Sequence, residues 1–172
     1  MTGVQTCALP IFEDTLSRIE GSIVHNSSAK AAVDMAVYDL FGKSLGVPLY
    51  RLWGGYRKEI VTDITISVNE PEQMAADSAE AAALGYKTLK IKLGKDPARD
   101  IERIRLIRQR IGYGVDVRVD ANQGWKPREA VRLIRQMEDA GLALELVEQP
   151  VPAHDIEGLK HVTDNVSVPV MA

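Results

Sequence analysis

Three ionisable side chains recur at a regular spacing along the chain. Asp120 follows Lys92 by 28 positions, and Glu148 follows Asp120 by 28 positions. Both carboxylates come directly after apolar residues, which is unusual for an ordinary surface charge. Two carboxylates that converge on one point suit a hard cation with oxygen ligands, Mg²⁺ first and Mn²⁺ second. A lysine beside them can serve as a general base, so these residue types indicate metal-assisted removal of a proton.

A second lysine, Lys90, precedes Lys92 in the run 88–94. Side chains alternate between the two faces of a strand, so both lysines are expected on one face and the apolar residues around them on the other. Taken alone, this pattern fits two interpretations: lysines with a chemical role, or an edge strand with one face in water. The two carboxylates downstream favour the first interpretation.

From Glu59 onward, short strands alternate with amphipathic helices. Strands joined by helical crossovers form a parallel sheet, which predicts an α/β fold. A fixed repeat of this length is typical of one strand plus one helix, and in a barrel the carboxyl ends of such strands line one mouth. The expected strands lie at 60–68, 88–94, 116–121, 144–148 and 168–172, and the expected helices at 70–84, 97–111, 127–140 and 154–162.

A closed barrel and an open doubly wound sheet both fit this order of elements. Open sheets that bind nucleotides usually carry a Gly-x-Gly-x-x-Gly or Walker loop after a strand. Neither loop follows any expected strand in this chain. The common nucleotide-binding sheets therefore lose support.

Residues 12–58 are expected to be helical and to serve packing rather than chemistry. Residues 13–20 fit the end of a helix, and Ser27 or Ser28 can cap a long helix that ends at Gly46. A short helical turn is expected at 49–53. Residues 1–11 show no helix or strand period and back-translate to a sequence that resembles a sequencing-adaptor end, so we interpret them as a non-native assembly artefact.

Composition excludes several classes of function. The net charge is −3 with a pI of about 5.7, which argues against nucleic acid and anionic membranes as partners. No apolar run approaches the roughly 20 residues of a membrane helix. The single cysteine, Cys7, cannot form an internal disulfide and fits a cytoplasmic location. A solvated helix face is predicted for four basic residues, Arg103, Arg105, Arg108 and Arg110.

Three short runs at this spacing resemble one known family. Lys90-Ile91-Lys92, Asp120-Ala121-Asn122-Gln123 and Glu148-Gln149-Pro150 together resemble the muconate-lactonizing subgroup of the enolase superfamily. The resemblance extends from about Ser28 to the end of the chain and is greatest for the dipeptide epimerases. It implies a modified (β/α)₇β barrel of the TIM type. Residues 59–172 would form the first half of this catalytic barrel, and residues 12–58 the helical C-terminal part of a capping domain.

The resemblance also implies roles for individual residues. Lys92 would remove the α-proton next to a carboxylate, and Lys90 would assist it. Asp120 and Glu148 would be two of three Mg²⁺ ligands, and the metal would stabilise the enediolate that forms; enolase-superfamily sites are a known example of a lysine base working with Mg²⁺. Asn122, Gln149 and Thr65 are candidates for further contacts to the metal ligands or the substrate. The alternative role for these residues is packing or strand-end hydrogen bonding.

The implied activity is epimerisation of a small dipeptide of the L-Ala-D/L-Glu type by a homo-oligomeric enzyme. A 1,1-proton transfer requires a base on each face of the substrate. The family's third metal ligand, second catalytic lysine and substrate-specificity elements would lie outside this chain, so we expect the 172-residue chain to be inactive alone. Muconate cycloisomerase, o-succinylbenzoate synthase and N-acylamino acid racemase are the related alternatives. A non-catalytic half-barrel is the alternative of another class.

Overall fold

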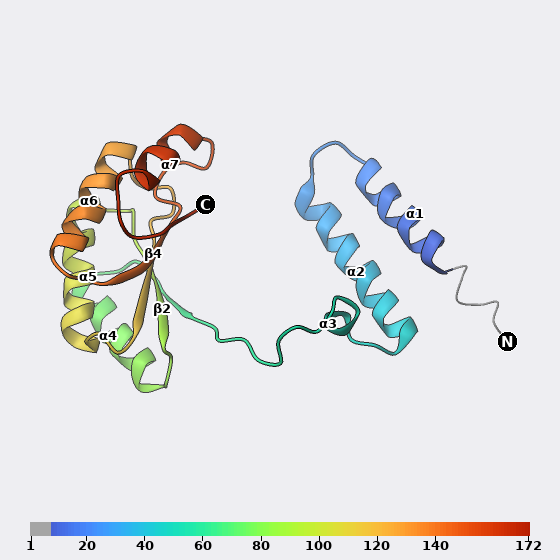
Figure 1. The fold of residues 1–172 in the computed structure, drawn as a ribbon, viewed down its shortest axis with the longest axis horizontal. Helices are drawn as coiled ribbons and strands as arrows, with labels where there is room; N and C mark the ends of the chain where they lie inside the picture. Colours follow the sequence, from blue (N-terminus) through green and yellow to red (C-terminus); the bar gives the residue numbers. More distant parts are fainter. Residues whose placement is uncertain (1–7) are drawn as a thin grey trace. The chain divides into compact units, whose positions relative to one another are not determined.

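The computed structural model describes residues 8–172, with side chains described from residue 11 onward. The chain divides into two compact units, one that runs to Ile60 and one from Val61 to Ala172. Figure 1 shows the helices of the first unit and the mixed strands and helices of the second. The interpretation of residues 1–11 as an artefact falls largely outside the described residues, and so does Cys7.

The first unit contains three helices, α1 (Ala8–Gly21), α2 (Ser27–Leu45) and α3 (Leu49–Leu52). Aromatic rings join α1 to α2: Phe12 stacks on Phe41 with ring centroids 4.3 Å apart and meets the edge of Tyr38. Two expectations were wrong here. Helix α1 begins at Ala8, inside the stretch that lacked a helical period, and the residue that precedes α2 is Asn26, which makes no side-chain cap.

The second unit is a five-stranded parallel sheet in the order β1-β2-β3-β4-β5, which confirms the α/β fold. Helices alternate with the strands along the chain and lie on one side of the sheet (Figure 1). The elements in order are β1 (Ile64–Ile66), α4 (Pro71–Ala83), β2 (Thr88–Lys92), α5 (Pro97–Ile111), β3 (Asp116–Asp120), α6 (Pro127–Asp139), β4 (Leu144–Glu148), α7 (Ile156–Thr163) and β5 (Val170–Met171).

Most boundaries agree with the predicted ones, but β1 is much shorter than 60–68. Ile60 and Val61 are more than four-fifths exposed and make no ladder contacts. Their β-branched side chains favour an extended backbone, yet pairing with β2 begins only at Ile64. Strand pairing requires a neighbour, which composition alone does not reveal.

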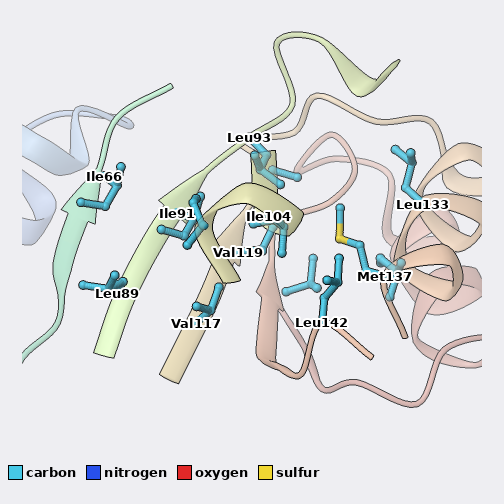
Figure 2. Close-up of a cluster of buried hydrophobic side chains, with 14 of the residues drawn as sticks. Ile66, Leu89, Ile91, Leu93, Ile104, Val117, Val119, Leu133, Met137 and Leu142 are labelled. Carbon is cyan, nitrogen blue, oxygen red and sulfur yellow. The ribbon is translucent and has the colours of Figure 1, made fainter. Parts of the chain in front are cut away.

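The hydrophobic core lies between the sheet and its helices (Figure 2). Alternate residues of β2 and β3 point into it, and all of these are fully buried: Leu89, Ile91, Val117 and Val119. Their helical partners follow the spacing of one helix face, and each buried side chain of this size contributes roughly 1.5–3 kcal/mol to the free energy of folding. These partners are Ile104, Ile107, Leu133, Ile134 and Met137.

The solvated helix face predicted for four arginines is wrong for two of them. Arg103 and Arg108 are only 4% and 5% exposed. Arg108 donates hydrogen bonds to the backbone carbonyls of Leu142, Ala143, Gly112 and Val115, near the amino ends of the strands. Burial lowers the pKa of Arg108, with Tyr113 and Asp116 acting in the opposite direction. These carbonyls accept the hydrogen bonds of the Arg108 guanidinium, and no carboxylate takes part in them.

None of the helices among residues 8–172 is long and apolar enough to cross a membrane.

Candidate active site

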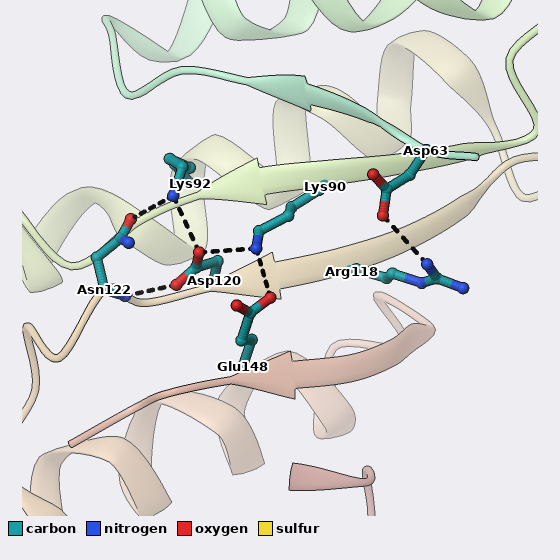
Figure 3. Close-up of polar contacts among 7 residues, drawn as sticks. All are labelled: Asp63, Lys90, Lys92, Arg118, Asp120, Asn122 and Glu148. Carbon is teal, nitrogen blue, oxygen red and sulfur yellow. Dashed lines mark hydrogen bonds and ion pairs between the residues drawn. The ribbon is translucent and has the colours of Figure 1, made fainter. Parts of the chain in front are cut away.

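The strand register brings the three regularly spaced residues side by side. Lys92 on β2 pairs with Asp120 on β3, which in turn pairs with Glu148 on β4. The 28-residue spacing therefore becomes a row across the carboxyl ends of three strands. Lys90, two residues before Lys92, lies on the same face. Figure 3 shows the four side chains pointing toward one another. Because side chains alternate along a strand, they lie on the face of the sheet opposite the buried apolar residues of β2 and β3.

Asp120 is the centre of this cluster. Its Oδ2 atom lies 3.0 Å from the ammonium of Lys90 and 3.0 Å from that of Lys92, and its Oδ1 atom accepts a 2.9 Å hydrogen bond from the backbone amide of Asn122. Asp120 is only 3% exposed. Burial raises the pKa of its carboxyl, but the hydrogen bonds from Lys92, Asn122 and Lys90 outweigh this effect and leave the pKa below its usual value. Asp120 is therefore a carboxylate at neutral pH.

The two lysines have different surroundings. Lys90 donates a 2.5 Å hydrogen bond to Glu148 in addition to its contact with Asp120. Burial lowers the pKa of Lys90, yet these two acids outweigh burial and raise the pKa, so Lys90 remains charged. Lys92 contacts one carboxylate and the side-chain oxygen of Asn122 at 3.3 Å, and its side chain is 34% exposed against 22% for Lys90. Lys92 is thus the more accessible of the two.

The donor set fits a hard divalent cation. Asp120 and Glu148 approach one cationic group, the ammonium of Lys90, within 3.0 Å and 2.5 Å. Mg²⁺ is commonly bound through one or two carboxylates while it keeps several waters. Among residues 8–172, no group of three or more Asp, Glu, His or Cys side chains gathers at one point. The candidate metal site on the described residues therefore consists of two carboxylates.

The three further candidates lie at different distances from this cluster. Asn122 joins it directly through its contacts with Lys92 and Asp120. Thr65 is exposed and pairs in register with Lys90 on the neighbouring strand. Gln149 directs its side-chain amide to the carbonyl of Val151 at 2.9 Å, within its own loop. The structure therefore brings Asn122 to Lys92, while the Gln149 side chain donates to a backbone carbonyl instead.

The loops after β2 and β3 are packed against each other through glycines. A Cβ atom built on Gly94 would lie 1.9 Å from the carbonyl oxygen of Ala121, and one built on Gly124 would lie 2.3 Å from the carbonyl oxygen of Gly94. Gly94 also has a φ angle of +90°, which residues with side chains rarely adopt. Only glycine allows this approach of the segments that follow Lys92 and Asp120.

We expect Gly94→Ala to lower the free energy of unfolding of the chain by about 3 kcal/mol, because backbone strain and steric overlap add. Gly85→Ala is the matched control, since Gly85 has a similar φ of +100° but no atom within 4 Å of the added methyl group. Urea unfolding of both variants measures the difference. Equal losses for the two variants would show that the close approach does not contribute.

A second charged group lies nearer the amino ends of the strands, and Figure 3 shows two of its members, Asp63 and Arg118, on the same face. Arg118 donates hydrogen bonds to Glu145 at 2.7 Å and 3.0 Å and to Asp63 at 3.1 Å. The hydrogen bond from Arg118 lowers the pKa of Glu145, and these acids raise the pKa of Arg118. Arg118 is thus paired with both carboxylates, which indicates a structural role for this group beneath the candidate active site.

Sequence reasoning missed a buried polar group behind the site. Asp100 is fully buried on α5 and accepts hydrogen bonds from Gly94, Arg103 and Trp125. The burial of Asp100 could have been predicted from helical spacing, because the buried residues of α5 follow intervals of three and four along one helix face. These residues are Asp100, Arg103, Ile104, Ile107 and Arg108.

Comparison with protein families matches the two parts of the chain separately. Residues 73–172 match the enolase C-terminal domain-like family, and residues 9–54 match the N-terminal domain of mandelate racemase and muconate lactonizing enzyme. The first match alone covers more than half of the chain.

Among individual proteins, the chain is 60% identical over 161 residues to the L-Ala-D/L-Glu epimerase of Clostridium acetobutylicum, covering 94% of this chain and 45% of that protein. The structure of a substrate-liganded complex of the L-Ala-D/L-Glu epimerase from Bacillus subtilis superposes with a TM-score of 0.92 at 54% identity, covering 96% of this chain and 46% of that one. A dipeptide epimerase from Enterococcus faecalis, complexed with Mg and L-Leu-L-Tyr, gives a TM-score of 0.85 at 41% identity, covering 94% and 49%. The chain spans less than half the length of the curated relatives it matches.

Proposed function

Since the chain belongs to the mandelate racemase and muconate lactonizing enzyme group of the enolase superfamily, we propose that it forms part of a Mg²⁺-dependent epimerase of L-Ala-D/L-Glu-type dipeptides. The observation that carries this proposal is the row of Lys92, Asp120 and Glu148 at the strand ends. The row combines a proton acceptor with a donor set for a hard cation. The high identity to L-Ala-D/L-Glu epimerases supports the substrate class.

In this proposal, Lys92 is the general base that removes the α-proton next to the substrate carboxylate. It is the more exposed lysine, and it is oriented by Asp120 and Asn122. Lys90 contacts both acids in this structure and stays protonated; with Mg²⁺ held by Asp120 and Glu148, it would supply positive charge near the substrate carboxylate. Bound Mg²⁺, or Mn²⁺ in its place, would stabilise the negative charge that develops on that carboxylate as the proton leaves.

We further propose residues 12–58 as part of a capping domain and residues 59–172 as the first half of the catalytic barrel, which the two separate family matches support. A 1,1-proton transfer needs a base on each face of the α-carbon. Lys90 and Lys92 lie on one face of one strand and would approach the substrate from the same direction. The 172-residue chain is therefore proposed to be inactive alone. As a separate proposal, the whole enzyme is a cytoplasmic homo-oligomer.

A chimaeric enzyme tests the proposal. This chain would replace the part of the B. subtilis epimerase that it matches, so that the relative supplies the remaining half. We expect the chimaeric enzyme to interconvert L-Ala-L-Glu and L-Ala-D-Glu in the presence of Mg²⁺, and to stop when the metal is chelated. We expect the 172-residue chain alone to show no interconversion.

Polarimetry or chiral chromatography measures the two epimers, and circular dichroism checks that the chimaeric enzyme is folded. A folded chimaeric enzyme that leaves both dipeptides unchanged would contradict the proposed function. Turnover of muconate, the precursor of o-succinylbenzoate or an N-acylamino acid instead would select one of the related activities. No Mg²⁺ binding at all would favour a non-catalytic half-barrel.

A further inference from the structure

The carboxylate of Asp100 lies behind the candidate active site and takes no part in the lysine cluster. It is fully buried in the first turn of α5. Its Oδ2 atom accepts hydrogen bonds of 3.0 Å from the backbone amide of Gly94 and 3.0 Å from the indole Nε1 of Trp125, and its Oδ1 atom accepts one of 2.8 Å from Arg103. A buried carboxylate is costly unless it is satisfied in this way, which makes each partner matter for its geometry.

The partners of Asp100 come from different strand-end loops. Gly94 follows β2, two residues after Lys92, and Trp125 follows β3, five residues after Asp120. One carboxylate oxygen thus joins the segments that carry the proposed base and the proposed metal ligand. The side chain of Trp125 is 1% exposed, so its indole has no alternative partner in water.

The network reaches the two flanking loops as well. Arg103 donates to the carbonyl of Asn69, after β1, at 3.1 Å and to that of Asp96 at 3.3 Å. The backbone amide of Trp125 donates to the carbonyl of Pro150, after β4, at 3.0 Å. The buried pair of Asp100 and Arg103 therefore connects the loops after β1, β2 and β3, and the backbone of Trp125 extends this connection to the loop after β4.

The loops that Asp100 joins are packed tightly against each other. The glycine contact between Gly94 and Gly124 leaves no room for even one methyl group. The amide of Leu93 donates to the carbonyl of Asp120 at 2.8 Å, which continues the β2–β3 ladder beyond Lys92. A shift of Gly94 or Trp125 would therefore pass to Lys92 and Asp120 rather than be absorbed.

We propose that Asp100 is a positioning residue that sets the place of Lys92 relative to Asp120 and Asn122 by holding Gly94 and Trp125 together. The inference rests on the proposed function for its catalytic consequence. Asp100 lies on α5, behind the candidate active site, so it acts through these two segments and does not touch the substrate. Displacements of about 1 Å at a reacting centre cost up to roughly a hundredfold in rate.

Two variants of the chimaeric enzyme test the proposal. Asp100→Asn keeps the shape of the side chain and removes its charge, and Trp125→Phe removes one donor while keeping an aromatic ring. We expect both to lower kcat by about tenfold to a hundredfold with little change in KM. We also expect unequal losses of α-proton exchange, with the larger loss for the epimer whose exchange depends on Lys92.

Arg108→Lys is the matched control. Arg108 is as buried as Arg103 on the same helix, but it binds carbonyls near the opposite ends of the strands. We expect this variant to lower the melting temperature and to leave kcat and the ratio of the two exchange rates unchanged. If Asp100→Asn and Trp125→Phe behave like Arg108→Lys, with lower stability and unchanged kcat, the positioning role is overturned.

Amide hydrogen exchange without substrate keeps the inference testable if the chimaeric enzyme has no epimerase activity. We expect Asp100→Asn to speed exchange at the amides of Leu93, Gly94 and Asn122, and Arg108→Lys to leave them unchanged. Unchanged exchange at these amides in Asp100→Asn would overturn the positioning role whatever the activity. If the chimaeric enzyme is inactive but Asp100→Asn still speeds exchange at these amides, the result counts against the proposed function alone.

Discussion

Replacing Lys92 with Met in the chimaeric enzyme is expected to lower the rate of epimerisation by about 10³-fold. General base catalysis typically contributes about 10²–10⁴-fold, and Lys92 is the accessible ammonium beside Asp120 and Asn122. Epimerisation needs proton transfer on both faces of the α-carbon, so loss of one base slows the overall reaction in both directions. Exchange of the proton on the other face does not require Lys92 and should continue.

Proton NMR in D₂O measures this result directly. We expect one epimer to lose its α-proton signal at close to the unsubstituted rate, while the other keeps its signal and neither is converted. Lys87→Met is the matched control, since Lys87 is exposed and directly precedes the same strand. It should retain full activity. Full epimerisation by the Lys92→Met variant would contradict the role of Lys92 as base.

Replacing Asp120 with Asn is expected to weaken Mg²⁺ binding by about a hundredfold or more. Changing partners of metal ligands costs about 10–100-fold in affinity, and loss of a ligand's own charge should cost at least as much. Asp120 is 3% exposed and faces two ammonium groups, so the substitution also leaves Lys90 and Lys92 with less compensating charge. Epimerisation should therefore fall together with metal affinity.

Isothermal titration of Mg²⁺ into the chimaeric enzyme measures the affinity. Asp116→Asn is the matched control, because Asp116 lies at the other end of the same strand, on the same face, and is exposed. It should bind Mg²⁺ as the unsubstituted protein does. Equal affinity in the Asp120→Asn and Asp116→Asn variants would exclude Asp120 as a metal ligand.

Much of the fold of residues 61–172 could be predicted from local patterns. Alternation of apolar residues and lysines in β2 predicted the buried and polar faces correctly, because a strand has only two faces. The 28-residue spacing predicted neighbouring positions for Lys92, Asp120 and Glu148, and the parallel register aligns them directly. A repeat of one strand and one helix returns the chain to the same level of the sheet each time.

The polar interior could not be predicted in the same way. Arg103, Arg108 and Asp100 are charged residues whose burial depends on carbonyls, an indole and a backbone amide that come from other loops. Helical spacing places them on the buried face of α5, but the charge alone suggests solvent. Which tendency prevails is decided by tertiary partners that the local sequence does not specify.

A crystal structure of the chimaeric enzyme with Mg²⁺ and L-Ala-L-Glu tests the central claim most directly. We predict that the metal is bound by the carboxylates of Asp120 and Glu148 and that the Lys92 amine faces the α-carbon of the glutamate residue. A metal held by other residues, or a dipeptide whose α-carbon lies away from Lys92, would contradict the proposed site.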